Sequence, residues 1–510
     1  MYRRSSTEQL SFENFYLPFS GKLSGGNRWI RLAELVPWET FEGEYAEQFS
    51  QEQGAPAKTF RVALGALIIK EKLGISDEET VEQIRENPYL QYFLGLSEYS
   101  DKAPFEASMM VHFRKRLNLE FVGRINEQIV KHPKESEQEE IKEKQDEKKE
   151  KGEKLEEEQL EEEQKENEAE PANEGKLLLD ATVAPADIRY PTDIKLLNEA
   201  REQTEIAIDA LYKQVKEQLP KKPRTYRREA RTAYLQIAKQ RKPNRKKIRK
   251  ALRKQLGYVR RNLAHIDTLI AAGAMLSELK KNLYRNLLVV SEVYRQQQSM
   301  YEESCSRIDD RIVSITQPHV RPIVRGKSGT PVEFGAKLSV SCVDGNAFLD
   351  HLSWNNFNES GDLENQVELF KSRFGHYPES VYVDQIYRTR SNRAYCRNLR
   401  IRITAPPLGR PVADDLAAIR KQTLEDAKIR NQIEGKFGQA KRRFSLDRVM
   451  TKLANTSETA IAITFLVMNL EALLKQLAFL FFSWIMMCRK CLFLPFGEVV
   501  FTFSALSWQF

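Results

Sequence analysis

The chain has 510 residues, a length that allows two to four domains and at least one large hydrophobic core. It carries a net charge of +8, and its five cysteines are scattered along a sequence that shows no signal peptide. This composition argues against a secreted, disulfide-stabilised protein and predicts a reducing cytoplasmic environment.

Residues 1–130 predict an all-α N-terminal domain made of short helices. A helix over residues 105–117 carries the basic residues Arg114, Lys115 and Arg116 near its end. This arrangement fits a helix-turn-helix module that docks on DNA, but a plain helical bundle explains the same pattern equally well.

Two strongly charged stretches follow, and they differ in character. Residues 131–175 form a low-complexity linker of mostly Glu and Lys, which has too few apolar side chains to fold into a globule. The segment Lys221–Arg261 instead carries eighteen Lys and Arg against a single acid, Glu229. The basic segment is either a polyanion-binding surface or simply a soluble charged helix.

From residue 176 to 475 the pattern predicts an α/β domain. Leu177–Val183 is a short apolar run interrupted by Asp180, and Val381–Asp384 is a second apolar run that ends in an acid. A buried ionised carboxylate is costly unless it is paired or binds a metal. A long helical insertion, a hairpin at about 194–305, separates the two runs. Strands that alternate with helices indicate a layered sheet domain.

The elements after the insertion are predicted from short apolar runs and turn residues. Asp344-Gly345 is a turn signal. Strands are predicted over 312–315, 332–343 and 401–404, helices over 363–374 and 388–397, and a loop over 405–411.

The basic part of the insertion is a candidate DNA-binding surface. Its face should contact phosphates without reading base sequence, because Lys and Arg on a helix present charge rather than a pattern of base contacts. The candidate residues are Arg245, Lys246, Lys247, Arg249 and Lys250.

The helix predicted over residues 427–441 carries an acid between two cations. Arg430 and Glu434 are four residues apart, and Lys441 returns to the same face two turns after Glu434. This face is either a surface ion-pair triad or a metal-binding carboxylate kept ionised by its neighbours. An apolar stripe at the same period predicts that the helix packs on the rest of the domain, through Ile429, Ile433 and Phe437.

The last segment, residues 476–510, is an apolar tail to which the sequence assigns no role. Arg489 and Lys490 divide it, and neither half reaches the roughly 20 residues that a membrane span needs. No membrane association is therefore expected.

Three acids from separate elements then suggest one site. Asp180 lies in a strand, Asp384 at the end of a strand, and Glu434 on a packed helix. Carboxylates held on rigid elements can bind two divalent cations roughly 3.5–4 Å apart, and such a pair catalyses phosphoryl transfer.

Several segments together resemble the DDE transposases of bacterial insertion sequences, in the branch with a Y-(2)-R-(3)-E-(6)-K signature on the catalytic helix. Arg430, Glu434 and Lys441 match the R, E and K positions, whereas Ala427 stands in place of the Tyr. The resemblance covers about residues 15–475 apart from the linker. It rests on LLLDATVAPADIRYPTD around Asp180, RPIVRGKSGTPVEFGAK from Arg321, VYVDQIYRTRSNRAYC around Asp384 and ENPYLQYFLGL from Glu86.

The resemblance implies an RNase H-like catalytic domain in which Asp180, Asp384 and Glu434 are the catalytic, metal-binding triad. The implied cofactor is a pair of Mg2+ ions, for which Mn2+ can substitute. Arg430 and Lys441 would contact DNA phosphates. The implied reaction is cleavage at the ends of the element, followed by attack of the freed 3′-hydroxyl on target DNA.

The implied partners are the element's terminal repeats, the target DNA and at least one further copy of this chain. The implied location is the bacterial cytoplasm, at the nucleoid. Two alternatives stay open from the sequence. One is a decayed, DNA-binding descendant of a transposase, suggested by Ala427 and the tail. The other is a general RNase H-fold nuclease, which the same acids would serve.

Overall fold

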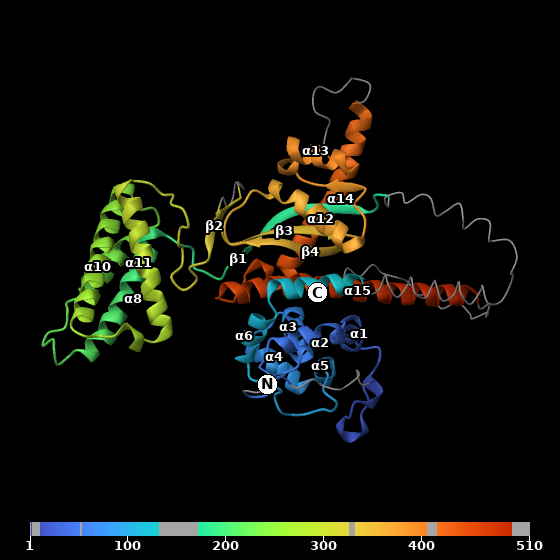
Figure 1. The fold of residues 1–510 in the computed structure, drawn as a ribbon, viewed down its shortest axis with the longest axis horizontal. Coiled ribbons are helices and arrows are strands. Elements are labelled where there is room, and N and C mark those ends of the chain that lie inside the picture. Colours follow the sequence, from blue (N-terminus) through green and yellow to red (C-terminus); the bar gives the residue numbers. More distant parts are fainter. Residues whose placement is uncertain are drawn as a thin grey trace.

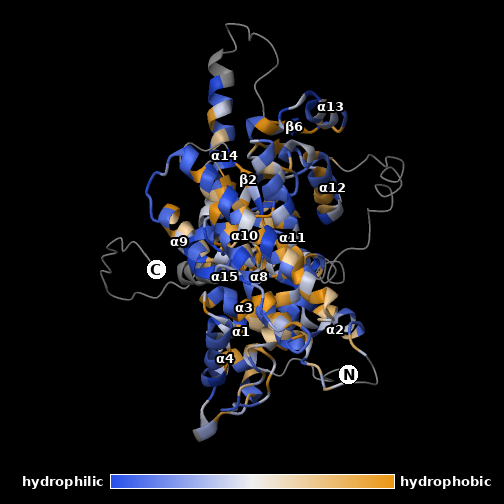
Figure 2. Ribbon diagram, turned by 90° about the vertical axis from the view of Figure 1, so that its left-hand side faces the viewer, coloured by the Kyte–Doolittle hydropathy of each residue, from blue (hydrophilic) through white to orange (hydrophobic). Residues whose placement is uncertain are grey.

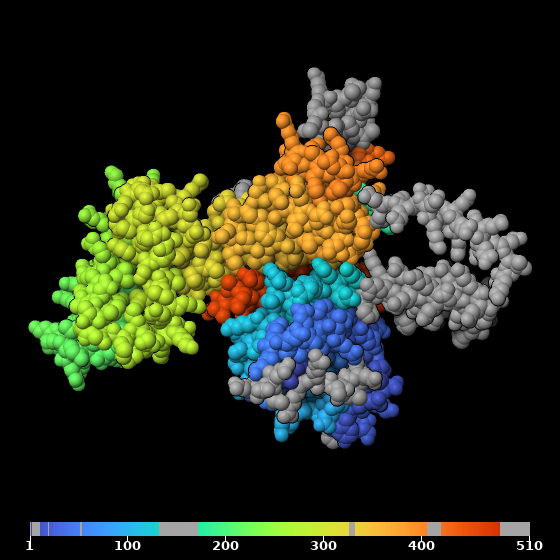
Figure 3. All heavy atoms as spheres, in the orientation of Figure 1, coloured from blue at the N-terminus to red at the C-terminus, as the bar shows by residue number. Residues whose placement is uncertain are grey.

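The computed structural model describes residues 2, 11–50, 54–131, 172–325, 332–404 and 416–491. It is a mixed α/β structure with an N-terminal group of helices, a sheet covered by helices and a separate helical insertion (Figure 1). The predicted linker lies almost entirely outside the described residues, as do the loop over 405–411 and the tail after residue 491. In Figure 3 the insertion, coloured yellow-green, stands as a lobe of its own beside the sheet region.

All regular elements in the described part of the first 131 residues are helices. Local signals explain their limits. The Thr59 side chain caps the first turn of α3, Gly74 ends that helix with φ +67°, and Ser76 caps α4. The helices are α1 (Arg28–Leu35), α2 (Trp38–Glu47), α3 (Phe60–Leu73), α4 (Asp77–Glu86), α5 (Pro88–Phe93), α6 (Met109–Arg116) and a helix over 119–131, with short 3-10 turns at Phe12–Asn14 and Pro18–Ser20.

The sheet has six strands and mixes both pairing directions. The order is β2-β3-β1-β5-β6, and β4 also pairs with β3. The contacts of β3 with β1, β2 and β4 are antiparallel, whereas β5 runs parallel to β1 and β6 parallel to β5. The strands are β1 (Lys176–Pro185), β2 (Arg321–Val324), β3 (Val332–Val343), β4 (Asn346–Ser353), β5 (Ser380–Tyr382) and β6 (Arg402–Ile403).

Helices cover both faces of the sheet, so alternate residues of β1 enter different cores. Leu177 and Leu179 pack with α12 (Leu363–Phe374) and α13 (Arg390–Asn398). Leu178 faces the other way and joins a core with α14 (Leu416–Arg443), α15 (Ala454–Cys491) and the N-terminal helices. Short 3-10 turns at Glu359–Gly361, Gln385–Tyr387 and Ser445–Asp447 connect these elements.

Two glycine-containing positions fix the register of β3. Asp344 and Gly345, at φ 50° and 78°, form the tight hairpin between β3 and β4, as the turn signal predicts. Gly335 lies opposite Pro185 of β1, and a Cβ atom there would sit 2.0 Å from the Ala184 carbonyl oxygen. Any side chain at position 335 would therefore separate β1 from β3.

The insertion between β1 and β2 is helical as predicted, but it is a bundle of four helices rather than a hairpin. Figure 2 views the molecule from the side of this bundle and shows polar and apolar residues alternating along its helices. Two small cores hold the bundle together, with Leu197, Val259 and Val293 in one and Ile208 and Leu269 in the other. The helices are α8 (Asp193–Gln214), α9 (Arg227–Ala238), α10 (Arg245–Ala271) and α11 (Lys281–Glu302), with a 3-10 turn at Leu276–Glu278.

Helix α15 lies between the N-terminal helices and the sheet (Figure 1). Its Asn469 side chain donates to the Ala347 carbonyl oxygen of β4 at 2.8 Å and to Asn126 Oδ1 at 2.9 Å. Its Thr464 hydroxyl donates to Glu71 of α3 at 2.7 Å, and Glu471 pairs with Lys72. These buried polar contacts fix the helix relative to both neighbours.

The length and apolar composition of α15 over Ala454–Phe479 would allow it to cross a membrane, but 67% of its apolar window is buried inside this structure. The helix is therefore explained as a core element. It also continues without interruption through the predicted boundary between residues 475 and 476.

The strand predicted over 312–315 is wrong. These residues form no regular element and pair with no strand of the described sheet. Ile312 and Ile315 are buried in a core of the insertion, beside Leu197 and Val290. An apolar run signals burial, and here the burial is against helices.

Candidate active site

Asp180 lies in β1, and Asp384 lies at the corresponding position just after β5, the parallel neighbour of β1. In the register of β1 and β5, Leu178 is opposite Tyr382, and each acid follows two residues later in its chain. Leu178 and Tyr382 both enter the core on the α14 side of the sheet. Because strand side chains alternate with a period of two, both carboxylates point to that same face.

The two acids differ in exposure. Asp180 is partly buried and accepts a hydrogen bond from the Ala181 N–H at 2.8 Å. Asp384 is exposed and accepts from the Gln385 N–H at 2.7 Å. Burial raises the pKa of the Asp180 carboxyl group to about 6. The Ala181 N–H and Arg430 oppose that rise, and the charges of Glu359 and Asp384 add to it.

Glu434 lies on α14, the helix that covers this face. Ile433 and Phe437 are buried against the sheet, so the predicted apolar stripe packs as expected. Glu434 sits at the edge of the packed stripe with 52% of its side chain exposed, and its carboxylate pairs with Arg430 at 3.0 Å. Arg430 also acts on the charge of Asp180, so it lies within electrostatic reach of that acid as well as of Glu434.

The sequence-predicted triad is thus brought together in part. Among the described residues, no three Asp, Glu, His or Cys side chains come close enough to hold one metal ion. The donor chemistry nevertheless fits Mg2+, which is typically bound by one or two carboxylates together with substrate phosphates. The repulsion between Asp180 and Asp384 is of the kind that a divalent cation relieves. Glu434 would join them only after leaving Arg430.

The other signature positions also lie on α14. Lys441 is in its last turn and partly buried. Ala427, which replaces the signature Tyr, is exposed, as are most of its neighbours in this part of the helix. The lost aromatic ring therefore leaves no gap in the core.

Two residues near Asp180 carry no local sequence signal. Glu359 pairs with Lys337 of β3 at 3.3 Å and acts on the charge of Asp180. Tyr387 is fully buried within reach of the charges of Glu359 and Asp180, and burial raises the pKa of its hydroxyl. Glu359 lies in a short 3-10 turn, so only the tertiary fold could have revealed it.

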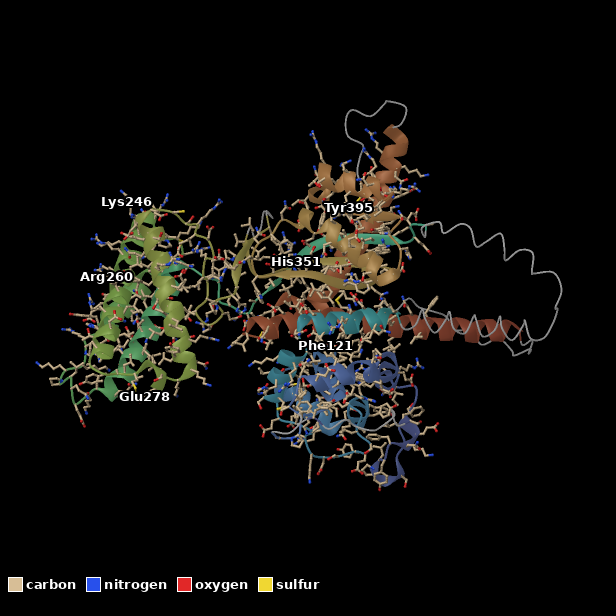
Figure 4. All side chains as sticks on the ribbon, viewed as in Figure 1. Phe121, Lys246, Arg260, Glu278, His351 and Tyr395 are labelled. Atoms are coloured by element: carbon tan, nitrogen blue, oxygen red, sulfur yellow. The ribbon has the colours of Figure 1, made fainter. Side chains whose placement is uncertain are left out.

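The predicted cations of the insertion are exposed on α10. Arg245, Lys246 and Lys247 have no ion-pair partner among the residues that the structure describes. Figure 4 shows Lys246 and Arg260 on the side of the bundle turned away from the sheet. Lys250 is also exposed, whereas Arg249 stacks on the Tyr301 ring at 4.4 Å and donates to Ser304 Oγ at 3.0 Å.

Two tyrosines of the insertion stack on arginines of the same bundle. Arg224 lies 4.5 Å from the centre of the Tyr226 ring, and Arg261 lies 4.6 Å from the same ring. Arg261 also stacks at 5.6 Å on Tyr258. These rings therefore orient guanidinium groups.

One basic residue of the N-terminal helices is structural. Arg114 has only 4% of its side chain exposed and forms a two-point ion pair with Asp77. Thr459 of α15 donates to its carbonyl oxygen at 2.8 Å. Lys115 is exposed, and Arg116 stacks on Phe49 at 4.0 Å. Of the three basic residues at the end of this helix, one is therefore committed to the core.

Comparisons with known proteins add independent information. Residues 381–471 match a family model described as a transposase DDE domain, and residues 18–116 match one described as a transposase domain (DUF772). A protein of Rhizobium meliloti, described as the uncharacterized protein ORF8 in the nfe locus, is 29% identical over 171 residues, covering 34% of this chain and 68% of its own. No solved structure matches. The DDE match includes Asp384 and all of the signature residues on α14.

Proposed function

We propose, from the premise that this chain is a transposase with a DDE domain, that it cleaves DNA at the ends of an insertion sequence and joins the freed 3′-hydroxyl to target DNA. The observation that carries the proposal is the in-register position of Asp180 and Asp384 beneath α14. Asp180 within a central strand and Asp384 just after the neighbouring strand, both covered by one packed helix, have the rigid support that metal-dependent phosphoryl transfer needs.

We further propose that the sheet domain is RNase H-like. Three antiparallel strands, β4, β3 and β1, are followed by two parallel ones, β5 and β6, with the first acid on the central strand. This strand order and the position of Asp180 support that assignment. The helical insertion then interrupts the domain between β1 and β2.

Asp180, Asp384 and Glu434 would hold the metal, with Mg2+ as the expected ion. The chemistry that two such ions supply is activation of a water or 3′-hydroxyl and stabilisation of the leaving oxygen. The protein's own contribution is position. The strands fix Asp180 and Asp384, and α14, packed on the same face of the sheet, would present Glu434 to them.

Arg430 would exchange partners when DNA binds. Its guanidinium group now pairs with Glu434, and both groups are on the same face of α14. A DNA phosphate can take the place of the carboxylate, because Arg binds either group with two parallel hydrogen bonds. That exchange would free Glu434 for the metal, and Lys441 would contact a neighbouring phosphate.

The first test is cleavage of a labelled duplex that carries the element's terminal repeat, with Mg2+ or with EDTA. We expect Mg2+-dependent nicking at the repeat boundary that Glu434→Ala and Asp384→Asn abolish while DNA binding remains. Glu425→Ala is the matched control, since it removes an exposed acid from the same helix. Unchanged cleavage by either site variant would refute the assignment.

The insertion would hold DNA by charge. Replacing Arg245, Lys246, Lys247, Arg249 and Lys250 with Gln should flatten the salt dependence of binding between roughly 50 and 200 mM salt. The measurement is the slope of log Kd against log salt. A slope equal to that of the wild type would show that the insertion does not touch DNA.

A second candidate is a DNA-binding descendant that no longer cuts. Ala427 at the signature Tyr position and the ion pair that occupies Glu434 favour it. End-specific binding without Mg2+-dependent nicking would establish this alternative. In either case the expected partners are DNA and a second copy of the chain, and the expected location is the cytoplasm at the nucleoid.

A further inference from the structure

We propose that Arg388 and Arg393, together with Arg430, form a phosphate clamp beside Asp384 that holds the DNA strand next to the reacting phosphate. The proposal rests on the proposed function and adds two residues that the catalytic-helix signature does not contain. Its basis is the position, the partners and the charge of the segment that follows β5.

The backbone around Asp384 orients both arginines. Arg388 Nη2 donates to the carbonyl oxygen of Val383 at 3.4 Å, and Val383 is the residue just before Asp384. Arg393, in the first half of α13, directs its Nε to the Arg388 carbonyl oxygen at 3.4 Å. Both guanidinium groups are therefore carried on the same short segment as the catalytic acid, and any change in that segment moves them together.

Arg388 has an unused donor. Its Nε is buried and has no hydrogen-bond partner among the described residues. A buried N–H of a charged group that lacks a partner is costly, and such a group in a candidate site points to a missing acceptor. A phosphate oxygen supplies that acceptor.

The neighbouring charges also favour an anion. Burial lowers the pKa of Arg388, Asp384 and Asp426 oppose this effect, and the positive charges of Arg393 and Arg430 add to it. The guanidinium groups of Arg393 and Arg430 thus both lie close enough to Arg388 to repel it.

The acids nearby are largely engaged with other groups. Asp426 accepts two hydrogen bonds from Arg402, at 2.7 and 2.8 Å, and Glu434 pairs with Arg430. Asp384 accepts from the Gln385 N–H, and metal binding would neutralise it further. A phosphate is the ligand that relieves the repulsion, and Arg is the side chain best suited to bind it with two hydrogen bonds.

The test measures binding of a labelled duplex carrying the element's terminal repeat, in EDTA so that no cleavage occurs, over a series of salt concentrations. The variant is Arg388→Gln with Arg393→Gln. The matched control is Arg397→Gln with Arg400→Gln, which makes the same charge change at exposed positions in and just after the last turn of α13. The clamp variant should lose about two from the salt slope, roughly one for each phosphate contact, whereas the control should lose less.

A second pair keeps the test independent of folding. Arg388→Lys with Arg393→Lys retains the charge but not the two-point geometry, so it should bind several-fold more weakly with an unchanged slope. Equal slope losses in the clamp and control variants, or wild-type affinity in the lysine pair, would overturn the proposal. If the wild type binds through the clamp but never nicks in Mg2+, the proposed function fails and the clamp stands. If the wild type nicks and the clamp variants bind unchanged, only the clamp fails.

Discussion

Replacing Asp180 by Asn should make the protein more stable at neutral pH while it abolishes activity. The Asp180 carboxyl group has a folded-state pKa of about 6, compared with an ordinary value of 3.8, and burial is the main cause. The difference of about 2.2 corresponds to about 3 kcal/mol of unfavourable free energy when the group is ionised, at about 1.4 kcal/mol per pH unit. Because the side chain is partly hydrated, this value is an upper limit.

The direction of the pH effect follows from the raised pKa. The folded state holds the Asp180 proton more tightly than the unfolded chain, so ionisation destabilises the fold above about pH 6. The gap between variant and wild type should be widest at pH 7.5 and should close as the pH falls from about 6 towards 4.

The assay is thermal unfolding in EDTA, followed by circular dichroism at several pH values. We expect the Tm of Asp180→Asn to exceed that of the wild type by a few degrees at pH 7.5. Asp384→Asn is the control, because Asp384 is exposed and Asn also caps the following turn. A variant Tm equal to or below the wild type at pH 7.5, or a gap that does not change with pH, would refute the reasoning.

Two further predictions concern the fold that positions the site. Gly335→Ala should cost about 3 kcal/mol of unfolding free energy and lower the Tm, because the added Cβ would collide with the Ala184 carbonyl oxygen on β1. Gly361→Ala is the control and should leave the Tm unchanged, because a Cβ at that position meets nothing within 4 Å. Equal Tm values for the two variants would contradict the close approach of β1 and β3. A chain that ends after Lys475 should keep its Tm within a few degrees of the full chain, because Leu473 and Leu474 are the last residues of α15 in the described core. A chain that ends after Leu453 lacks α15 altogether and should be insoluble. A soluble, cooperatively unfolding 1–453 chain would show that α15 is dispensable.

Local signals predicted several elements to the residue. The limits of β3 and α12 agree with the sequence-based ranges, because a hairpin turn ends the former and a glycine at φ 84° ends the latter. Strand β4 was not identified, since its later half is partly exposed and contains Asp350 and His351. A strand without alternating apolar residues gives no periodic signal.

From the sequence, each site residue could be predicted within its own helix or strand, but the contacts between these elements could not. Asp180 interrupts one apolar run and Asp384 ends another, but the register of β1 and β5 that places both acids on one face is seen only in the fold. Whether Glu434 pairs with Arg430 or binds a metal depends on side-chain geometry, and the sequence left both possibilities open. Glu359 and the buried Arg114 reach their partners through tertiary contacts that no short segment encodes.

The central position of α15 has a consequence for how the chain is made. The N-terminal helices share one core with α15, yet 454 − 131 = 323 residues separate the end of the helix over 119–131 from the start of α15. At about 5–20 residues per second, the ribosome needs roughly 16–65 seconds to bridge that interval. During this time the apolar face of the N-terminal helices that packs on α15 is exposed to solvent. We therefore expect the newborn protein to need chaperones during this interval. Asp180 on β1 is likewise synthesised well before α14 and α15, the helices that complete the core on its face of the sheet.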